Sequence, residues 1–376
     1  YLKVILMKKN KVKKIKLYIF HPYSGKGGAD LSISRLINGI SEKKYEIDFL
    51  SLNNPAIKKK VLKKIKYKKI SASRTLFCFS EVINYINADK KNYRKKIFIS
   101  NQNFANVLSL IFIKKIRNIK IVLLERNHLD EFKYFNSPLD FLKKNTIKIM
   151  MKFFYNKADL IIGNSYDLSK SLQRFINRKV HTIYNPCYFS TTRKIKKSEK
   201  KRITILNVGR LEPQKNHITL LKAIKNLKNK SYIRLIIIGY GSEFFNLSKY
   251  IQNNNLKDIV KIYRNVEDST KFYKEADLFV LSSLYEGFPN VLVEAAQNDV
   301  PIISTKCNSG PREILLNGKA GQLVNVKDDF MMSKKIQSFI IDKRDSQKKA
   351  IICKKNLYRF ENKYNLSKFE NLFDKL

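Results

Sequence analysis

The sequence of 376 residues has no long uninterrupted apolar segment. A membrane-spanning helix needs about 20 consecutive apolar residues, and the best run here, Val107 to Ile113, ends at Lys114 and Lys115. The basic N-terminal stretch has no apolar signal core and no small-residue cleavage site, so export is not predicted. We therefore expect a cytoplasmic protein, with Met7 as a candidate initiator because Tyr1 is not one.

Cysteine is scarce, and the acidic residues lack a metal-binding pattern. The four cysteines are scattered, with no paired spacing for zinc or redox chemistry: Cys78, Cys187, Cys307 and Cys353. We expect them to be reduced thiols. No Asp-any-Asp pair stands at the end of a predicted strand, so the sequence predicts neither a metal requirement nor a cofactor.

Negative charge is also scarce, because 76 Lys and Arg residues face 31 Asp and Glu residues and give a net charge of +45. Such an excess is typical of proteins with a polyanionic partner. Lys, Asn and Ile are abundant together, however, so genome-wide composition bias explains most of it. The sequence has no zinc-ligand array, no aromatic-basic RNA motif and no heptad pattern, and a nucleic-acid partner is not predicted. An anionic membrane surface remains a candidate partner.

The segment from Ile57 to Ile70 is the strongest candidate for membrane contact. Ile57, Val61 and Ile65 recur every four residues, and lysines fill most of the other positions. The pattern predicts a basic amphipathic helix. That helix would either lie on a membrane surface or pack its apolar stripe on a sheet with its lysines in water.

Two domains are predicted from length and pattern, because 44% hydrophobic residues in a chain of this size can fill two cores. Apolar runs alternate with helical stretches, which indicates parallel sheets covered on both faces and hence an α/β fold of two Rossmann-like units facing across a cleft. The first series of predicted strands is Ile15 to Phe20, Ile47 to Leu50, Ile97 to Ile99, Ile119 to Leu124, Leu160 to Ile162 and Val180 to Tyr184. The second is Ile203 to Val208, Ile233 to Ile238, Ile259 to Tyr263, Leu278 to Leu281 and Pro301 to Ser304.

Domain boundaries follow from the break in this pattern. Residues 190–202 are polar and lysine-rich and indicate a linker between a first domain at 1–189 and a second at 203–350. Residues 351–376 have a helical pattern. No repeat that would indicate a solenoid is found.

The most informative segment is 282–296, which holds two glutamates. An apolar strand ends at Leu281, a Gly/Pro turn carries Glu286, and a helix beginning at Asn290 contains Glu294. Ligands of open α/β sheets bind at the carboxyl ends of strands. The N–H groups around Val291 and Leu292 at the helix start are expected to be unpaired and to form an anion seat.

This Glu-seven residues-Glu pattern resembles the retaining glycosyltransferases of family four, which have the GT-B fold. The resemblance spans roughly residues 201–325, in the family's order: Asn207 to Ile224 with Arg210 and Lys215, Ile236 to Glu243, Val300 to Thr305, Ser309 to Leu315 and Gly318 to Val324. Looser likeness in the first half covers Gly27 to Asp30, His128, Ala158 to Ser165 and Ile183 to Pro186. In this fold the last helix crosses back to pack on the first domain.

The resemblance implies roles for these residues. Arg210 and Lys215 would stabilise the leaving diphosphate in place of a metal, while Glu286 and Glu294 would accept hydrogen bonds from sugar and ribose hydroxyls. His128 would orient the reacting groups. The other donor-binding positions are Gly209, Gly287, Phe288, Asn290, Val291, Leu292, Glu313, Gly27 and Gly28. Paired carboxylates also hydrolyse glycosides, but a hydrolase has no diphosphate to hold.

The function so implied is transfer of a hexose or N-acetylhexosamine from a nucleotide-diphosphate sugar, most commonly a UDP-sugar, to a glycan or polyprenyl-linked acceptor in surface polysaccharide synthesis. Such an enzyme would work at the inner face of the cytoplasmic membrane. Two alternatives stay open: a nucleotide-sugar epimerase of the same fold, and a basic membrane-surface binding protein without activity. Two positions depart from the family pattern, which commonly has glutamate at Asp30 and glycine at Arg264.

Overall fold

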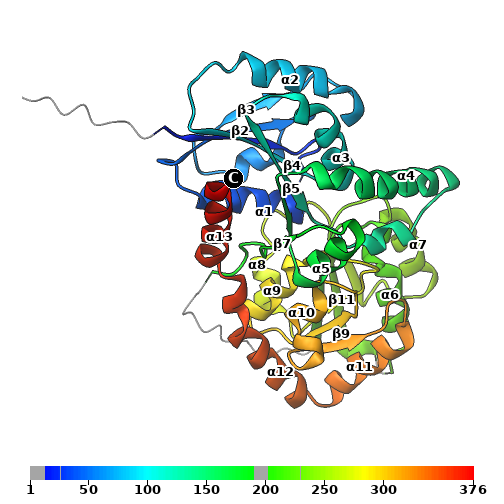
Figure 1. The fold of residues 1–376 in the computed structure, drawn as a ribbon. Coiled ribbons are helices and arrows are strands. Elements are labelled where there is room, and N and C mark those ends of the chain that lie inside the picture. The colour runs from blue at the N-terminus through cyan, green and yellow to red at the C-terminus, as the bar shows by residue number, and fades with distance from the viewer. Residues whose placement is uncertain (1–12, 26, 190–201, 229) are drawn as a thin grey trace, which may run out of the picture.

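The computed structural model describes residues 13–25, 27–189, 202–228 and 230–376. They form two parallel sheets, each flanked by helices (Figure 1). The first sheet has seven strands in the order β3-β2-β1-β4-β5-β6-β7, and the second has six in the order β10-β9-β8-β11-β12-β13. The predicted fold class, two Rossmann-like parallel-sheet domains, is confirmed. The predicted linker at 190–202 lies almost entirely outside the described residues.

The first domain contains seven strands and five α-helices among its described residues. Its strands are β1 (Ile15–Phe20), β2 (Tyr45–Ser51), β3 (Lys66–Lys69), β4 (Lys95–Asn101), β5 (Ile119–Glu125), β6 (Leu160–Gly163) and β7 (His181–Thr182). Its helices are α1 (Gly28–Gly39), α2 (Phe79–Ala88), α3 (Asn103–Phe112), α4 (Pro138–Phe154) and α5 (Tyr166–Ile176). The strands β1, β2, β4, β5 and β6 are buried on both faces, as their apolar runs predicted, whereas the edge strands β3 and β7 are partly exposed.

The second domain repeats this alternation. Its strands are β8 (Ile203–Val208), β9 (Ile233–Ile238), β10 (Val260–Tyr263), β11 (Leu278–Leu281), β12 (Ile302–Thr305) and β13 (Gln322–Val324). Its helices are α6 (His217–Lys225), α7 (Phe244–Asn253), α8 (Thr270–Glu275), α9 (Asn290–Gln297), α10 (Pro311–Ile314), α11 (Asp329–Ile341) and α12 (Arg344–Lys355). A last helix, α13 (Asn362–Lys375), lies beside α1, and its Phe369 and Phe373 enter the core of the first sheet (Figure 1).

The helix predicted over Ile57 to Ile70 is wrong. This segment is a short 3₁₀ helix (Ala56–Lys60), a loop and the edge strand β3, which pairs with β2 from Asp48 to Ser51. Lysines three and four residues apart would repel one another on a helix, whereas pairing with β2 satisfies their backbone groups. Ile57 is fully buried and Val61 packs against the same core, so this segment offers no free apolar stripe.

All four cysteines are buried and unpaired, as expected for reduced thiols. Across the described ranges, no helix is both long and apolar enough to cross a membrane.

Candidate active site

Glu286 and Lys215 form the centre of the predicted site. Glu286 follows the carboxyl end of β11, and Lys215 lies in the turn between β8 and α6. The ammonium Nζ of Lys215 lies 2.5 Å from Oε1 of Glu286, and the two side chains are only 15% and 6% exposed. The parallel neighbours β8 and β11 bring these residues together, although 71 positions separate them.

Serine hydroxyls fix the loop around Glu286. Ser283 Oγ donates to Oε1 of Glu286 at 2.6 Å, and Ser309 Oγ donates to its backbone carbonyl at 2.6 Å. Ser282 Oγ donates to the carbonyl of Lys215 at 2.9 Å and so joins the two loops. These serines were missed by the sequence analysis, although the pair Ser282-Ser283 directly after a strand was a usable signal.

Gly287 allows the two domains to touch. A Cβ at this position would lie 1.7 Å from the carbonyl oxygen of Arg126, which belongs to the first domain. The neighbouring residue Asn127 forms an isolated antiparallel bridge with Gly287. Gly310 packs behind this loop with φ +79°, where any side chain would be strained. The predicted site is therefore a closed contact between the domains.

The other predicted cation, Arg210, is exposed, and its guanidinium donates to Gln214 Oε1 at 3.2 Å. Gly209 precedes it, and a Cβ there would touch the side chain of Lys215 at 3.5 Å. Arg210 and Lys215 therefore come from one turn, with Lys215 engaged by a carboxylate and Arg210 open to a ligand.

Helix α9 begins at Asn290, as predicted, but its N–H groups are not all unpaired. The N–H of Leu292 donates to the carbonyl of Pro289 at 3.0 Å, so the expectation for this residue is wrong; the first turn closes on itself. Asn290 Oδ1 accepts from Asn185 Nδ2 at 2.9 Å across the domain boundary. The start of α9 thus contacts the first domain through Asn290, whereas Val291 packs partly buried against the core of the second domain.

Two further predicted residues have clear partners within the protein. Phe288 is buried, and its ring packs edge-on against Phe360 with the centroids 4.9 Å apart. Only the backbone of Phe288 is therefore available to contact a nucleotide-sugar donor. Glu294, one turn into α9, accepts from the Tyr273 hydroxyl at 3.0 Å and lies 3.9 Å from the guanidinium of Arg35 on α1.

The glycine turn of the first domain opens α1 directly opposite α9. A Cβ on Gly28 would lie 3.8 Å from Asn290 Nδ2, and one on Gly27 would lie 3.7 Å from Asp30, both ordinary contacts. Asp30 accepts from Ser24 Oγ and from the N–H of Gly25, each at 2.8 Å. Burial alone would raise the pKa of Asp30, but hydrogen bonds from His21 and Ser24 outweigh it and lower that pKa. Asp30 therefore stabilises the glycine turn before α1 through hydrogen bonds.

His128 lies at the predicted interface but is held by its own loop. It is buried, and its Nδ1 lies 3.2 Å from the backbone nitrogen of Asp130 and 3.0 Å from Oδ2 of the same residue. Asp130 also accepts from Asn308 of the second domain at 2.6 Å. Hydrogen bonding to His128 lowers the pKa of the Asp130 carboxyl. His128 thereby stands beside a carboxylate that remains ionised.

Glu313 reaches across to the first domain. Its carboxylate accepts from the N–H groups of Tyr166 and Asp167, at 2.9 and 2.6 Å, at the start of α5. Burial raises the pKa of Glu313, although these hydrogen bonds oppose that shift. The structure thus places Glu313 at a helix start of the opposite domain.

Arg126 was missed by the sequence analysis. It follows β5, and its guanidinium donates to neutral oxygens only: Asn101 Oδ1 at 2.7 Å, Ser32 Oγ at 2.7 Å and Asn185 Oδ1 at 2.9 Å. Within the described residues, no carboxylate lies within ion-pair distance of Arg126. Burial lowers the pKa of Arg126 to about 10, so it stays charged at neutral pH. An unpaired cation in this position attracts an anion.

Not every concavity of the molecule belongs to this site. A cavity of about 260 Å³ lies at the amino ends of β1 and β2, the sheet edge opposite the candidate site, and its lining includes Glu42, Asp48 and Lys64. None of the predicted donor-binding residues lines it. Among the described residues, no group of three or more His, Cys, Asp or Glu side chains is placed to hold a metal ion.

Two facing Rossmann-like domains, with cations and carboxylates gathered at the carboxyl ends of the second sheet, have the architecture of the GT-B fold. In the sequence comparison, residues 189–358 match the family model described as "Glycosyl transferases group 1". The chain thus carries a domain of this family and is a glycosyltransferase.

Relatives and solved structures extend the similarity beyond that domain. The chain is 27% identical over 364 residues, 89% of this chain and 92% of the relative, to the N-acetylgalactosamine-N,N'-diacetylbacillosaminyl-diphospho-undecaprenol 4-alpha-N-acetylgalactosaminyltransferase of Campylobacter jejuni. It is 26% identical, over 86% of this chain and 89% of the relative, to the amylovoran biosynthesis glycosyltransferase AmsD of Erwinia amylovora. Anabaena HepE, solved in complex with UDP and glucose, superposes with a TM-score of 0.78 at 17% identity, over 96% of this chain and 100% of that one.

Proposed function

We propose that this protein is a retaining, metal-independent transferase. It moves a hexose or N-acetylhexosamine from a UDP-sugar to a glycan or polyprenyl-linked acceptor during bacterial surface polysaccharide synthesis. The buried Lys215–Glu286 pair beside the open cation Arg210 is the observation that carries this proposal. The undecaprenol-linked substrate of the Campylobacter relative and the polysaccharide made with the Erwinia relative support the acceptor class, and the UDP complex of HepE supports the donor.

The chemistry requires the bond between the anomeric carbon and the diphosphate to break while negative charge gathers on the leaving phosphate. Arg210 and Lys215 stabilise that charge, and in the closed site their effect is larger than in water. Arg126, from the opposite domain, adds a third cation. The residues themselves thus supply the positive charge that a divalent ion supplies in other transferases.

The carboxylates position the donor. Glu286, held by Lys215 and Ser283, accepts hydrogen bonds from donor-sugar hydroxyls, and Glu294 accepts from the ribose. The acceptor oxygen attacks the anomeric carbon on the face that the diphosphate leaves, and its proton passes to a phosphate oxygen of the leaving group. His128 with Asp130 orients the acceptor at the interface between the domains.

This proposal places the enzyme in the cytoplasm, at the inner face of the cytoplasmic membrane, because a polyprenyl-linked acceptor is anchored in a bilayer.

The test is a panel of nucleotide sugars with EDTA present, measuring binding by calorimetry and nucleotide release with and without polyprenyl-diphosphate-linked glycans. The expected result is saturable binding and acceptor-dependent release for a UDP-sugar, with an α-linked product by NMR from an α-linked donor. Conversion of the donor without acceptor would indicate an epimerase instead. A lack of binding to every donor would support a binding protein without activity, and activity only after metal addition would refute metal independence.

A further inference from the structure

Helix α4 carries two apolar faces, and only one of them is covered. Ile147 and Met151 are buried against the first domain. On the outer side, Leu139, Leu142, Ile149 and Phe153 are 80%, 63%, 58% and 70% exposed. Their spacing of three, seven and four residues places them along one side of a helix, a stripe roughly 20 Å long. We name these four residues the α4 stripe.

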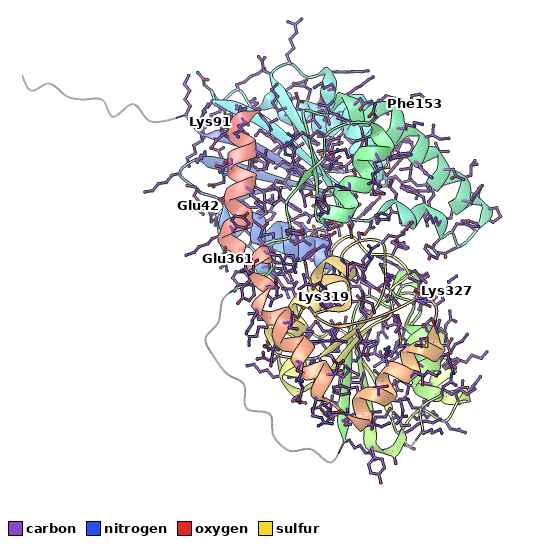
Figure 2. All side chains as sticks on the ribbon, turned by 60° about the horizontal axis from the view of Figure 1, so that its bottom comes forward. Glu42, Lys91, Phe153, Lys319, Lys327 and Glu361 are labelled. Atoms are coloured by element: carbon purple, nitrogen blue, oxygen red, sulfur yellow. The ribbon has the colours of Figure 1, made fainter. Side chains whose placement is uncertain are left out.

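Two more aromatic side chains extend this surface at the amino end of α4. Phe135 and Phe141 are both about half exposed, and their rings pack edge-on with the centroids 5.0 Å apart. The helix projects from the side of the first domain (Figure 1), and Phe153 marks its carboxyl end (Figure 2). Isolated exposed apolar residues are normal on proteins, but four on one side of a helix beside two phenylalanines mark a contact surface.

The charge around the α4 stripe identifies the kind of partner. Residues 132–158 contain one acidic residue, Asp140, which is paired with Lys144 at 3.0 Å. The same range contains six lysines: Lys133, Lys143, Lys144, Lys148, Lys152 and Lys157. A second copy of this helix would bring like charges together, whereas an apolar row flanked by lysines complements a bilayer with anionic headgroups.

We propose that the α4 stripe inserts into the headgroup region of an anionic membrane, with Lys143 and Lys152 against the lipid phosphates. Both lysines are exposed, and they lie on opposite flanks of the stripe. The membrane contact that the sequence analysis sought in residues 57–70 is thereby assigned to α4.

This assignment also relates the membrane to the candidate active site, and it rests on the proposed function for the identity of the acceptor. Tyr134, four residues before α4, stacks on Tyr285 of the second domain with the ring centroids 5.6 Å apart, and Tyr285 precedes Glu286. Lys144 of α4 donates to the carbonyl of Tyr134 at 2.6 Å. A helix lying on the bilayer would therefore hold the domain interface beside the membrane, where a lipid-linked acceptor is presented.

The experiment is cosedimentation of the full chain with vesicles of phosphatidylcholine alone and of phosphatidylcholine with about 30% of the anionic lipid phosphatidylglycerol. We expect binding to the anionic vesicles that falls with added salt. The double variant Leu142→Ser/Phe153→Ser should reduce binding at least tenfold, and Lys143→Gln/Lys152→Gln should reduce it by more than tenfold, since each lysine contributes roughly fivefold. The matched control is Ile341→Ser, a residue 77% exposed at the end of α11 in the other domain.

Three outcomes would overturn the proposal. In the first, wild type and both α4 variants bind vesicles equally. In the second, the Ile341→Ser control loses as much vesicle binding as the α4 variants. In the third, the α4 variants keep vesicle binding, and light scattering shows that they have instead lost self-association. Calorimetry with UDP on the same proteins separates this proposal from the proposed function. If the α4 variants bind UDP normally but do not bind vesicles, the membrane contact of α4 is supported. If wild type binds vesicles but no nucleotide sugar, only the proposed transferase function is refuted.

Discussion

The ammonium group of Lys215 lies 2.5 Å from a carboxylate oxygen of Glu286, and both side chains are nearly buried. Removing one partner of such a pair leaves an uncompensated charge at a cost of about 3–5 kcal/mol. Without ligand, each charge neutralises the other. A donor diphosphate competes for Lys215 and releases Glu286 to accept from sugar hydroxyls, so the pair couples donor binding to sugar positioning.

We predict that Glu286→Gln lowers sugar transfer at least 100-fold while UDP affinity is kept or raised, because the amide keeps the size of the side chain but loses the charge that competes with the diphosphate for Lys215. Transfer kinetics and calorimetry measure the two effects. Glu42→Gln, an exposed substitution in the first domain, is the control and should leave both unchanged. Normal transfer by Glu286→Gln would remove this residue from the site.

The contact between Gly287 and Arg126 predicts a second result. In Gly287→Ala the new Cβ would meet the Arg126 carbonyl at 1.7 Å, and backbone atoms cannot yield that far, so the domains should separate. Small-angle scattering should show a larger radius of gyration, and transfer should fall at least 100-fold with UDP binding retained. Gly28→Ala also faces the other domain, but its Cβ would have 3.8 Å of clearance, and this variant should keep the wild-type scattering curve.

Features set by local sequence were predictable, whereas those set by distant contacts were not. The strands β8, β9 and β11 have their predicted bounds because buried parallel strands are continuous apolar runs between turns. Strand β3 was missed because Lys66–Lys69 carries no apolar pattern and exists through its pairing with β2. Glu313 could be recognised in its motif, but its contact with Tyr166 spans 147 residues and depends on how the domains meet.

Arg126 provides a third prediction. Its guanidinium holds Asn101 and Ser32 of the first domain, and its bond to Asn185 extends to Asn290 at the start of α9. Arg126→Lys keeps the charge but cannot reach all three acceptors, so we expect transfer to fall 10- to 100-fold with little loss of thermal stability. Lys114→Arg, an exposed basic exchange, is the control. A full wild-type rate for Arg126→Lys would show that only the positive charge at this position contributes to transfer. The rate of Arg126→Met would then measure the contribution of that charge.

The last prediction concerns pH. Glu125, at the end of β5, is fully buried and accepts from the Tyr155 hydroxyl and from Asn106 Nδ2. Burial raises the pKa of Glu125 to about 7, from 4.5 for the exposed residue.

Between those two values the folded chain binds the proton and the unfolded chain releases it, so the free energy of unfolding falls as pH rises from 4.5 to 7 and stays low above 7. The full difference between the two pKa values corresponds to at most about 3 kcal/mol in the free energy of unfolding. Glu125→Gln removes this titration while keeping an acceptor for Tyr155. Urea unfolding at pH 5 and pH 8 should therefore show the variant gaining about 1–3 kcal/mol relative to wild type at the higher pH. A difference between the two proteins that does not change with pH would mean that Glu125 ionises normally in the folded state.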